Sequence, residues 1–196
     1  GVCSDSHTLR YYQTGVSGKG SGLPEYSEVG YVDDKEITHY SSDSRLERPV
    51  APWMSKVEPD YWERNTQIGR SNEAVSKHNV RTGMSRFNQT GGLHFNQRMS
   101  GCELRDDGST AGYLQYGYDG RDFTHLDTES WSFIPTIHEA QITAQRWSSP
   151  DVRVGERYMI YLQDECIEWL KIHINNGRED LEKRVVPQVK VTGHRS

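Results

Sequence analysis

The feature that most limits what this chain can fold into is a plan that occurs twice. Residues 7–51 have the alternating pattern and turn residues of four short strands, and a helical pattern runs from Pro52 to about Asn88. Residues 94–137 again predict four strands, and a helical pattern resumes at Glu139. The two strand sets also share a motif after or around an Asp-rich turn: Gly30-Tyr31 with Ile37-Thr38-His39-Tyr40, and Gly117-Tyr118 with Phe123-Thr124-His125-Leu126. This self-similarity indicates an internal duplication.

A duplicated unit of strands followed by a helix predicts an α+β fold. The simplest arrangement is one eight-stranded antiparallel sheet, with two long broken helices across one face and a groove between them. The breaks are expected at Pro59 in the first helix and at Ser148–Pro150 in the second. The first helix has only a thin apolar stripe, made of Val57, Tyr61, Ile68, Val75, Val80 and Met84. Its polar flank would line the groove.

Residues 156–177 predict a helix with two different faces. One face repeats at steps of three and four residues and indicates core packing: Met159, Leu162, Cys166, Leu170 and His173. The neighbouring column is polar and aromatic: Tyr161, Glu165, Trp169 and His173. Asn176-Gly177 is a typical stop signal. The second column predicts a face that looks into something polar.

Three cysteines, Cys3, Cys102 and Cys166, allow one disulfide and one remaining thiol. Cys102 lies in a predicted strand and Cys166 on the predicted core face, which makes these two the natural pair. Two free buried thiols in a cytosolic protein are the alternative. Asn88-Gln89-Thr90 is a glycosylation sequon, and together with the cysteines it favours an extracellular protein.

Composition and motifs exclude several classes of function. A net charge of −5 argues against nucleic acid, and no run of 18 apolar residues predicts a membrane span. No signal-like segment opens the chain, so a secreted protein would be in its mature form. No zinc-protease, nucleophile-elbow, calcium-loop or dinucleotide motif occurs, and the acidic pairs Asp33-Asp34 and Asp106-Asp107 sit at turns. The expectation is a protein that is not an enzyme, with no cofactor and no metal.

Several segments in order resemble the two membrane-distal domains of a major histocompatibility complex (MHC) class I heavy chain. They are SHTLRYY (6–12), VGYVDD (29–34), APW (51–53), DYWERNTQ (60–67), RFNQTGG (86–92), MSGCELRDDG (99–108), YGYDGRDF (116–123), ITAQRW (142–147) and CIEWL (166–170). The sequence resembles non-mammalian vertebrate members of this family more closely than mammalian ones. The resemblance implies an alpha-1 half at 1–91, an alpha-2 half at 92–184, and the start of a truncated immunoglobulin-like alpha-3 domain at 185–196.

The resemblance also implies which residues hold the two ends of a short peptide. The amine would be bound by Tyr11, Tyr61, Tyr161, Trp169 and His173, with the histidine standing where a fourth tyrosine is usual. The carboxylate would be bound by Asn79, Thr82, Arg86, Thr143, Arg146 and Trp147. Arg86 replaces the mammalian tyrosine, and two arginines around one carboxylate allow charge-assisted binding.

Further residues are expected to line the groove and set side-chain preference. They are Gln13, Glu28, Asn65, Ile68, Asn72, Ser76, Arg98, Ser100, Leu114, Tyr116 and Tyr158. Ser100 replaces a usual tyrosine, which would open the pocket near the second peptide residue. Whether Arg98 and Glu28 pair with each other or with the ligand is open at this point.

The function implied is antigen presentation, in which a peptide held by both ends is displayed to T cells. The implied partners are a short peptide, beta-2-microglobulin under the sheet, and the T-cell receptor and CD8. The implied location is the extracellular face of the cell surface, with the membrane anchor outside this sequence. The alternative is a nonclassical class I molecule whose groove is restricted, empty or filled by a ligand other than a peptide. An enzyme on this fold is the third reading, without support from any motif.

Overall fold

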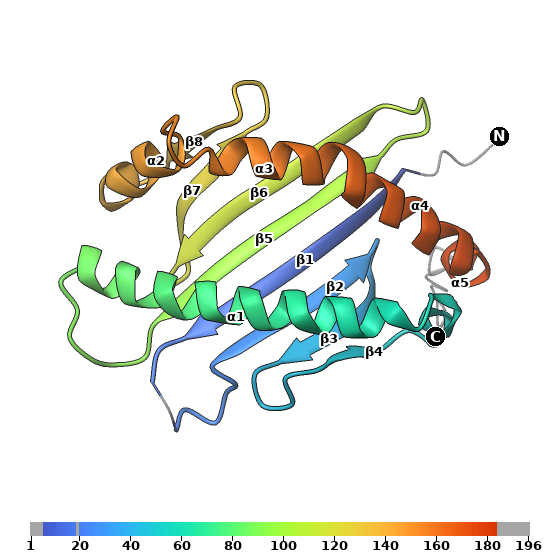
Figure 1. Ribbon diagram of the computed structural model, residues 1–196, viewed down its shortest axis with the longest axis horizontal. Helices are drawn as coiled ribbons and strands as arrows, with labels where there is room; N and C mark the ends of the chain where they lie inside the picture. The colour runs from blue at the N-terminus through green and yellow to red at the C-terminus, as the bar shows by residue number, and fades with distance from the viewer. Residues whose placement is uncertain (1–5, 19, 184–196) are drawn as a thin grey trace, which may run out of the picture.

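A single eight-stranded antiparallel sheet forms the base of the protein, as a computed structural model of residues 6–18 and 20–183 shows. The strand order is β4-β3-β2-β1-β5-β6-β7-β8, so β1 and β5 meet at the centre (Figure 1). The strands are β1 His7–Val16, β2 Tyr26–Val32, β3 Lys35–Ser41, β4 Glu47–Pro49, β5 Phe95–Leu104, β6 Thr110–Tyr118, β7 Arg121–Asp127 and β8 Ser132–Pro135. The predicted fold class is confirmed.

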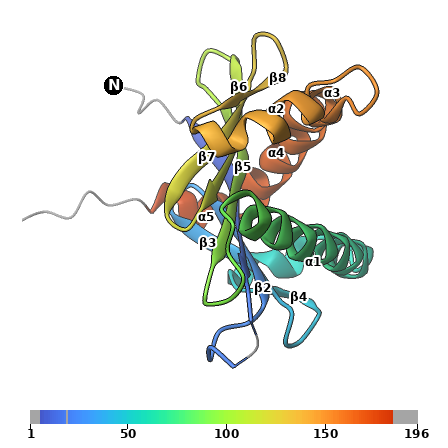
Figure 2. The ribbon, with the colours of Figure 1, turned by 90° about the vertical axis from the view of Figure 1, so that its left-hand side faces the viewer.

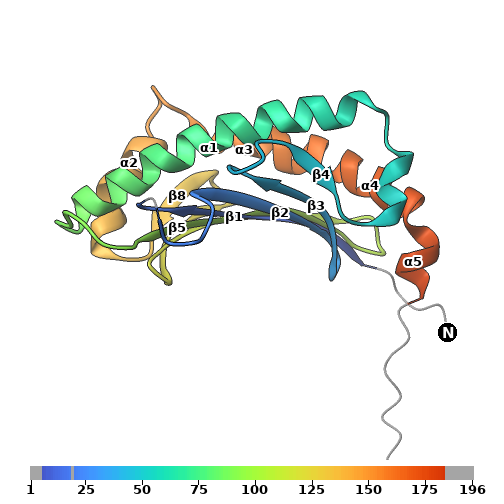
Figure 3. The same cartoon turned by 90° about the horizontal axis from the view of Figure 1, so that it is seen from below.

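All the long helices lie on one face of the sheet (Figures 2 and 3). A 3-10 turn, η1 (Pro52–Lys56), precedes α1 (Asp60–Arg86), which crosses the strands of the first half. The second half carries η2 (His138–Ala140), α2 (Gln141–Trp147), α3 (Val154–Ile160), the π-helical segment η3 (Tyr161–Glu165), α4 (Cys166–Asn176) and α5 (Arg178–Glu182). Viewed down on the sheet, α1 runs along one side and the α2–α4 series along the other, with the ribbons of the central strands visible between them (Figure 1).

The first helix packs on the sheet through small residues, because large rings rise from the floor beneath it. A side chain at Gly69 would overlap the ring of Tyr40, and one at Gly83 would overlap the ring of Tyr118. The predicted apolar stripe is therefore partly wrong. Tyr61 and Val80 are buried, but Ile68 is 46% exposed and Val75 is 53% exposed.

The second helix is anchored by the predicted disulfide. Cys102 of β5 and Cys166 at the start of α4 are bonded, with their Cα atoms 6.2 Å apart. Both are fully buried, beside Leu9 and Leu170. Leu162, Leu170 and His173 are also buried, so most of the predicted core face is confirmed. The π-helical segment just before Cys166 was not predicted; such single-turn insertions often mark functional positions.

Smaller differences concern ends and extents. The last of the four strands predicted in residues 94–137 is short: it begins at Ser132, since Trp131 has a positive φ of 56°, and it ends at Pro135. Cys3 and residues 185–196, where a further domain is expected to begin, lie outside the described residues. The division at residue 91 stays a prediction. In the part of the chain that the structure describes, no helix has the length and apolarity needed to cross a bilayer.

Candidate functional site: a groove between the two helices

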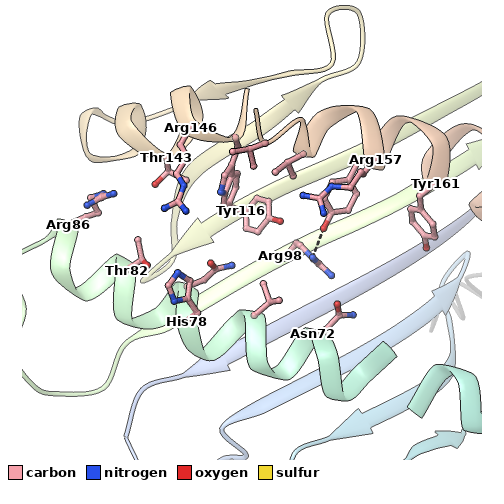
Figure 4. A pocket seen from close by; sticks show the side chains of 16 residues that line it. Asn72, His78, Thr82, Arg86, Arg98, Tyr116, Thr143, Arg146, Arg157 and Tyr161 are labelled. Atoms are coloured by element: carbon pink, nitrogen blue, oxygen red, sulfur yellow. Dashed lines mark hydrogen bonds between the residues drawn. The ribbon is translucent and has the colours of Figure 1, made fainter. Parts of the chain in front are cut away.

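A cavity of about 500 Å³ opens between α1 and the α2–η3 series. Its floor comes from β5 and β6 through Arg98 and Tyr116 (Figure 4). The helical walls contribute Asn72, Val75, His78, Asn79, Thr82, Arg86, Thr143, Arg146, Trp147, Val152, Val154, Arg157, Tyr158 and Tyr161. Eleven of the residues expected at the ends or the lining of the groove are thus brought together in one cavity.

One end of this cavity is rich in hydrogen-bond donors. Thr143 and Arg146 point in from α2, opposite Thr82 and Arg86 of α1 (Figure 4). The Arg86 Nε is buried without a hydrogen-bond partner. Trp147 closes the end from beneath, with its ring 4.8 Å from that of Tyr116 and 5.0 Å from that of Phe133. Hydroxyl and guanidinium donors next to this cluster of aromatic rings are suited to binding a carboxylate.

Beyond the other end of the cavity, which Tyr161 lines, three largely buried phenols come together. Burial, followed by the proximity of Tyr61 and Tyr161, raises the pKa of Tyr11 well above its ordinary value. Burial likewise raises the pKa of Tyr61 and of Tyr161. These hydroxyls therefore stay protonated at neutral pH and act as neutral donors and acceptors. The Trp169 ring packs 5.1 Å from that of Tyr61 and covers this cluster.

His173 lies beneath the aromatic cluster and has no exposed surface. The rings of Trp169, Trp53 and Tyr61 surround it at 5.8, 6.0 and 6.2 Å. Neither ring nitrogen has a hydrogen-bond partner, and burial lowers its pKa to about 4. The imidazole is thus neutral at physiological pH and, in this structure, supports the rings without opening onto the groove. A contact with a ligand amine stays a prediction.

A row of polar side chains crosses the floor between the two ends. Cross-strand pairs place Arg98 beside Gln13, Gln13 beside Glu28, Glu28 beside Tyr40, and Tyr40 beside Glu47. Glu28 is buried and accepts hydrogen bonds at Oε1 from Gln13, Asn72 and Tyr26. Arg98 donates instead to the Tyr158 hydroxyl, at 2.6 Å. Among the described residues, Arg98 and Glu28 do not form an ion pair.

The other expected lining residues divide into buried and exposed positions. Ser100 and Leu114 are buried under the second helix, where Leu114 packs against Leu162. Ser76 and Gln13 line a small satellite cavity beside the main one. Asn65 donates to the Tyr61 carbonyl, and Ile68 lines none of the described cavities. Asn88, the predicted glycosylation position, is exposed just after α1.

Sequence reasoning missed Val75, His78, Val152, Val154 and Arg157 in the main cavity, and Asn96 beneath it. The signal for Val75 was present, because residues 72, 75, 79, 82 and 86 recur at steps of three and four along one helix face. It was placed in the core stripe because it is apolar. Glu47 was also missed: burial, then the nearby charge of Glu28, raises its pKa to about 8.

Comparison with known proteins agrees with this architecture. The family model for the class I histocompatibility antigen, domains alpha 1 and 2, matches residues 5–181. The chain is 39% identical over 188 residues to the chicken class I histocompatibility antigen, F10 alpha chain, covering 95% of this chain and 54% of that protein. It is 42% identical to the mouse major histocompatibility complex class I-related protein 1, with the same coverage of 95% and 54%. It is also 42% identical over 192 residues to the mouse H-2 class I histocompatibility antigen, K-W28 alpha chain, covering 96% and 52%.

The chain spans about half the length of these relatives. Their family consists of non-enzymatic immune molecules found at the cell surface, which agrees with the prediction that the chain is not an enzyme. The match covers both helices and all eight strands. The chain therefore belongs to the MHC class I family, of which it contains the alpha-1 and alpha-2 domains.

Proposed function

We propose that this protein presents short peptides and displays them to T-cell receptors. The observation that carries the proposal is the pair of polar ends on one groove. Buried phenols under Trp169 at one end suit an amine, and the cluster of Thr143, Arg146 and Arg86 at the other suits a carboxylate. Binding of this kind holds main-chain termini and leaves the choice of side chains to the floor between them.

Elution of bound material from the full-length protein, followed by mass spectrometry, tests the proposal. The expected result is a set of peptides with free carboxyl termini and a narrow length range. Replacing Arg146 by Gln is expected to reduce the recovered amount, because a charge-assisted hydrogen bond is lost. Arg121→Gln, an exposed change on β7, serves as the matched control. Recovery of lipid, of a small metabolite or of nothing would overturn the proposal.

A second candidate is a nonclassical molecule with a small ligand. Two observations favour it: the 42% identity to a class I-related protein, and a main cavity that does not include Tyr11, Tyr61 or Trp169. A cavity of about 500 Å³ is within the size range of small-molecule sites. The same elution experiment separates the two candidates, since a single small compound would replace the peptide series.

Beta-2-microglobulin is the partner we propose for the lower face of the sheet. That face carries Tyr12, which is 44% exposed and packs edge-on against Tyr31 at 5.6 Å. Exposed aromatic side chains of this kind are enriched at protein interfaces. Tyr12→Asp is expected to abolish co-purification of beta-2-microglobulin with the full-length chain, while Arg81→Gln, at an exposed position of α1 on the other face of the sheet, is expected to leave it intact. Unchanged co-purification of Tyr12→Asp would place the partner elsewhere.

A further inference from the structure

The main cavity of the groove is lined by four arginines and one histidine and by no carboxylate. The basic residues are His78, Arg86, Arg98, Arg146 and Arg157. Neither Asp nor Glu occurs among the lining residues, although the chain as a whole carries a net charge of −5. Like charges gathered in a partly enclosed space raise its affinity for anions. The cavity is therefore charged opposite to the protein that surrounds it.

Three described arginines outside the cavity, Arg45, Arg105 and Arg153, have acidic partners, whereas none of those inside does. Arg105 pairs with Glu103 at 3.7 Å, and Arg153 pairs with Glu156 at 3.7 Å. Within the described part of the chain, no ion pair within 4.0 Å includes any of the four cavity arginines. Arg153 and Arg157 make the contrast clear, because they lie one helical turn apart and only Arg157 lines the cavity. The missing negative charge must come from a ligand or from solvent.

A peptide terminus accounts for only part of this positive charge. The proposed carboxylate position lies between Arg146 and Arg86, at the α2 end. Arg98 stands on β5 and Arg157 on α3, further along the groove from Arg146 (Figure 4). A single carboxylate bound at the α2 end leaves this second pair of guanidinium groups without a counter-charge.

The neighbours of Arg98 are the phenols Tyr158 and Tyr116 and include no carboxylate partner among the described residues. Its Nη1 donates to the neutral Tyr158 hydroxyl at 2.6 Å, and its guanidinium carbon lies 5.8 Å from the centre of that ring. Its Nε is buried and has no partner. A guanidinium group presents five N–H donors and stays charged at any physiological pH. Glu28 does not neutralise it, because Gln13 stands between the two in the strand register.

We infer that the groove selects peptides that carry an aspartate or glutamate side chain at an interior position, before the carboxyl terminus, with Arg98 and Arg157 as its binding residues. The inference rests on the proposed function and specifies its substrate class. The planar guanidinium of Arg98 matches a carboxylate in two parallel hydrogen bonds. Arg157, on the α3 wall above this floor residue, adds a second positive charge to the same cavity. An amide or apolar side chain would leave both charges unpaired.

Peptides eluted from the full-length protein and from three variants test the inference. In the wild type and in the control Arg153→Gln, one interior position is expected to be enriched in Asp and Glu. In Arg98→Gln and in Arg157→Gln that enrichment is expected to fall or disappear. Thermal unfolding of each variant, measured with the same synthetic peptide bound, shows whether it folds.

Binding of matched synthetic peptides gives the second measurement. An eluted sequence is resynthesised with its interior Asp replaced by Asn, and the two are compared in competition. The replacement is expected to weaken binding to the wild type by about tenfold or more, since one charge-assisted contact is lost. The loss is expected to be smaller in Arg157→Gln. This pair of peptides remains informative with the wild type alone if Arg98→Gln fails to fold.

The outcomes separate this inference from the proposed function. Peptides without an acidic interior position, or equal binding of the Asp and Asn forms, would overturn the inference and leave peptide presentation intact. Recovery of no peptide at all would overturn both. Enrichment that persists in both Arg98→Gln and Arg157→Gln would assign the acidic side chain to other residues and overturn the role given to this pair.

Discussion

Arg98 and Tyr158 join the floor of the groove to its wall. The Nη1 of Arg98, in the middle of β5, donates to the hydroxyl of Tyr158 on α3 at 2.6 Å. Figure 4 shows this hydrogen bond between two side chains that line the cavity. It fixes a charged group of the floor beneath a helix that is interrupted on both sides, by the break at residues 148–153 and by the π-helical segment.

Tyr158→Phe is expected to lower the free energy of unfolding by about 1–3 kcal/mol, because a partly buried guanidinium loses an acceptor. Denaturant unfolding measures the change. Tyr12→Phe, on the opposite face of the sheet, is the control, since no hydrogen bond of its hydroxyl is present among the described contacts. Equal stability of Tyr158→Phe and the wild type would show that water replaces the phenol without cost.

His173 is expected to make the protein less stable in acid. Its pKa of about 4 in the folded state is below the ordinary value of 6.5, so the unfolded state binds the proton more readily. The contribution of the neutral imidazole to the free energy of unfolding is fully present above pH 6.5. It is lost as the pH falls toward 4, and the total loss is about 3 kcal/mol. His173→Leu, which cannot be protonated, is expected to lose this part of the pH dependence.

Unfolding curves at pH 7.5, 6 and 4.5 measure the effect of His173. The exposed His125→Gln is the matched control and is expected to keep the wild-type pH dependence. If His173→Leu and the wild type lose stability in parallel between pH 6.5 and 4.5, the buried imidazole is not the cause.

Glu47 acts in the opposite direction. Its pKa is raised from 4.5 to about 8, first by burial and then by the charge of Glu28. Ionisation is therefore easier in the unfolded state, and stability is expected to fall as the pH rises from 4.5 through 8. Glu47→Gln should remove this decrease and stabilise the protein at pH 8 by a few kcal/mol, on the order expected for a buried carboxylate. The prediction would be contradicted if the wild type and Glu47→Gln had equal melting temperatures at every pH from 5 to 8.

Gly69→Ala is expected to destabilise the protein although alanine favours helix more strongly. The added methyl would overlap the ring of Tyr40, whose hydroxyl is held by Glu73 at 3.0 Å. Strain of this kind in a packed core costs about 1–3 kcal/mol, which exceeds the gain of about 1 kcal/mol in helix propensity. Ser71→Ala, at an exposed position of the same helix, should be neutral or slightly stabilising. An increase in melting temperature for Gly69→Ala would show that α1 can rise from the sheet.

Much of the fold could be predicted from the sequence, because the alternation of apolar and polar residues and the turn residues act locally. The two sets of four strands, the two broken helices and the Cys102–Cys166 bond were predicted and are confirmed. The polar flank of α1 also gave several cavity residues in advance, such as Asn72, Asn79 and Thr82. Spacing along one helix is enough to place such residues on the same side.

The tertiary structure alone decided which side chains face ligand and which face core. Ile68 and Val75 share apolar character with Val80, yet only Val80 is buried, since the rings of Tyr40 and Tyr118 determine where α1 can approach the sheet. The spacing of His173 fits both the core face and the polar face predicted for its helix. Only the packing of its ring against Trp53 and Trp169 shows that it belongs to the core. The sequence by itself determined the layers and the groove. The charge of the cavity, with Arg98 and Arg157 on different elements and no carboxylate between them, arises only when distant segments meet.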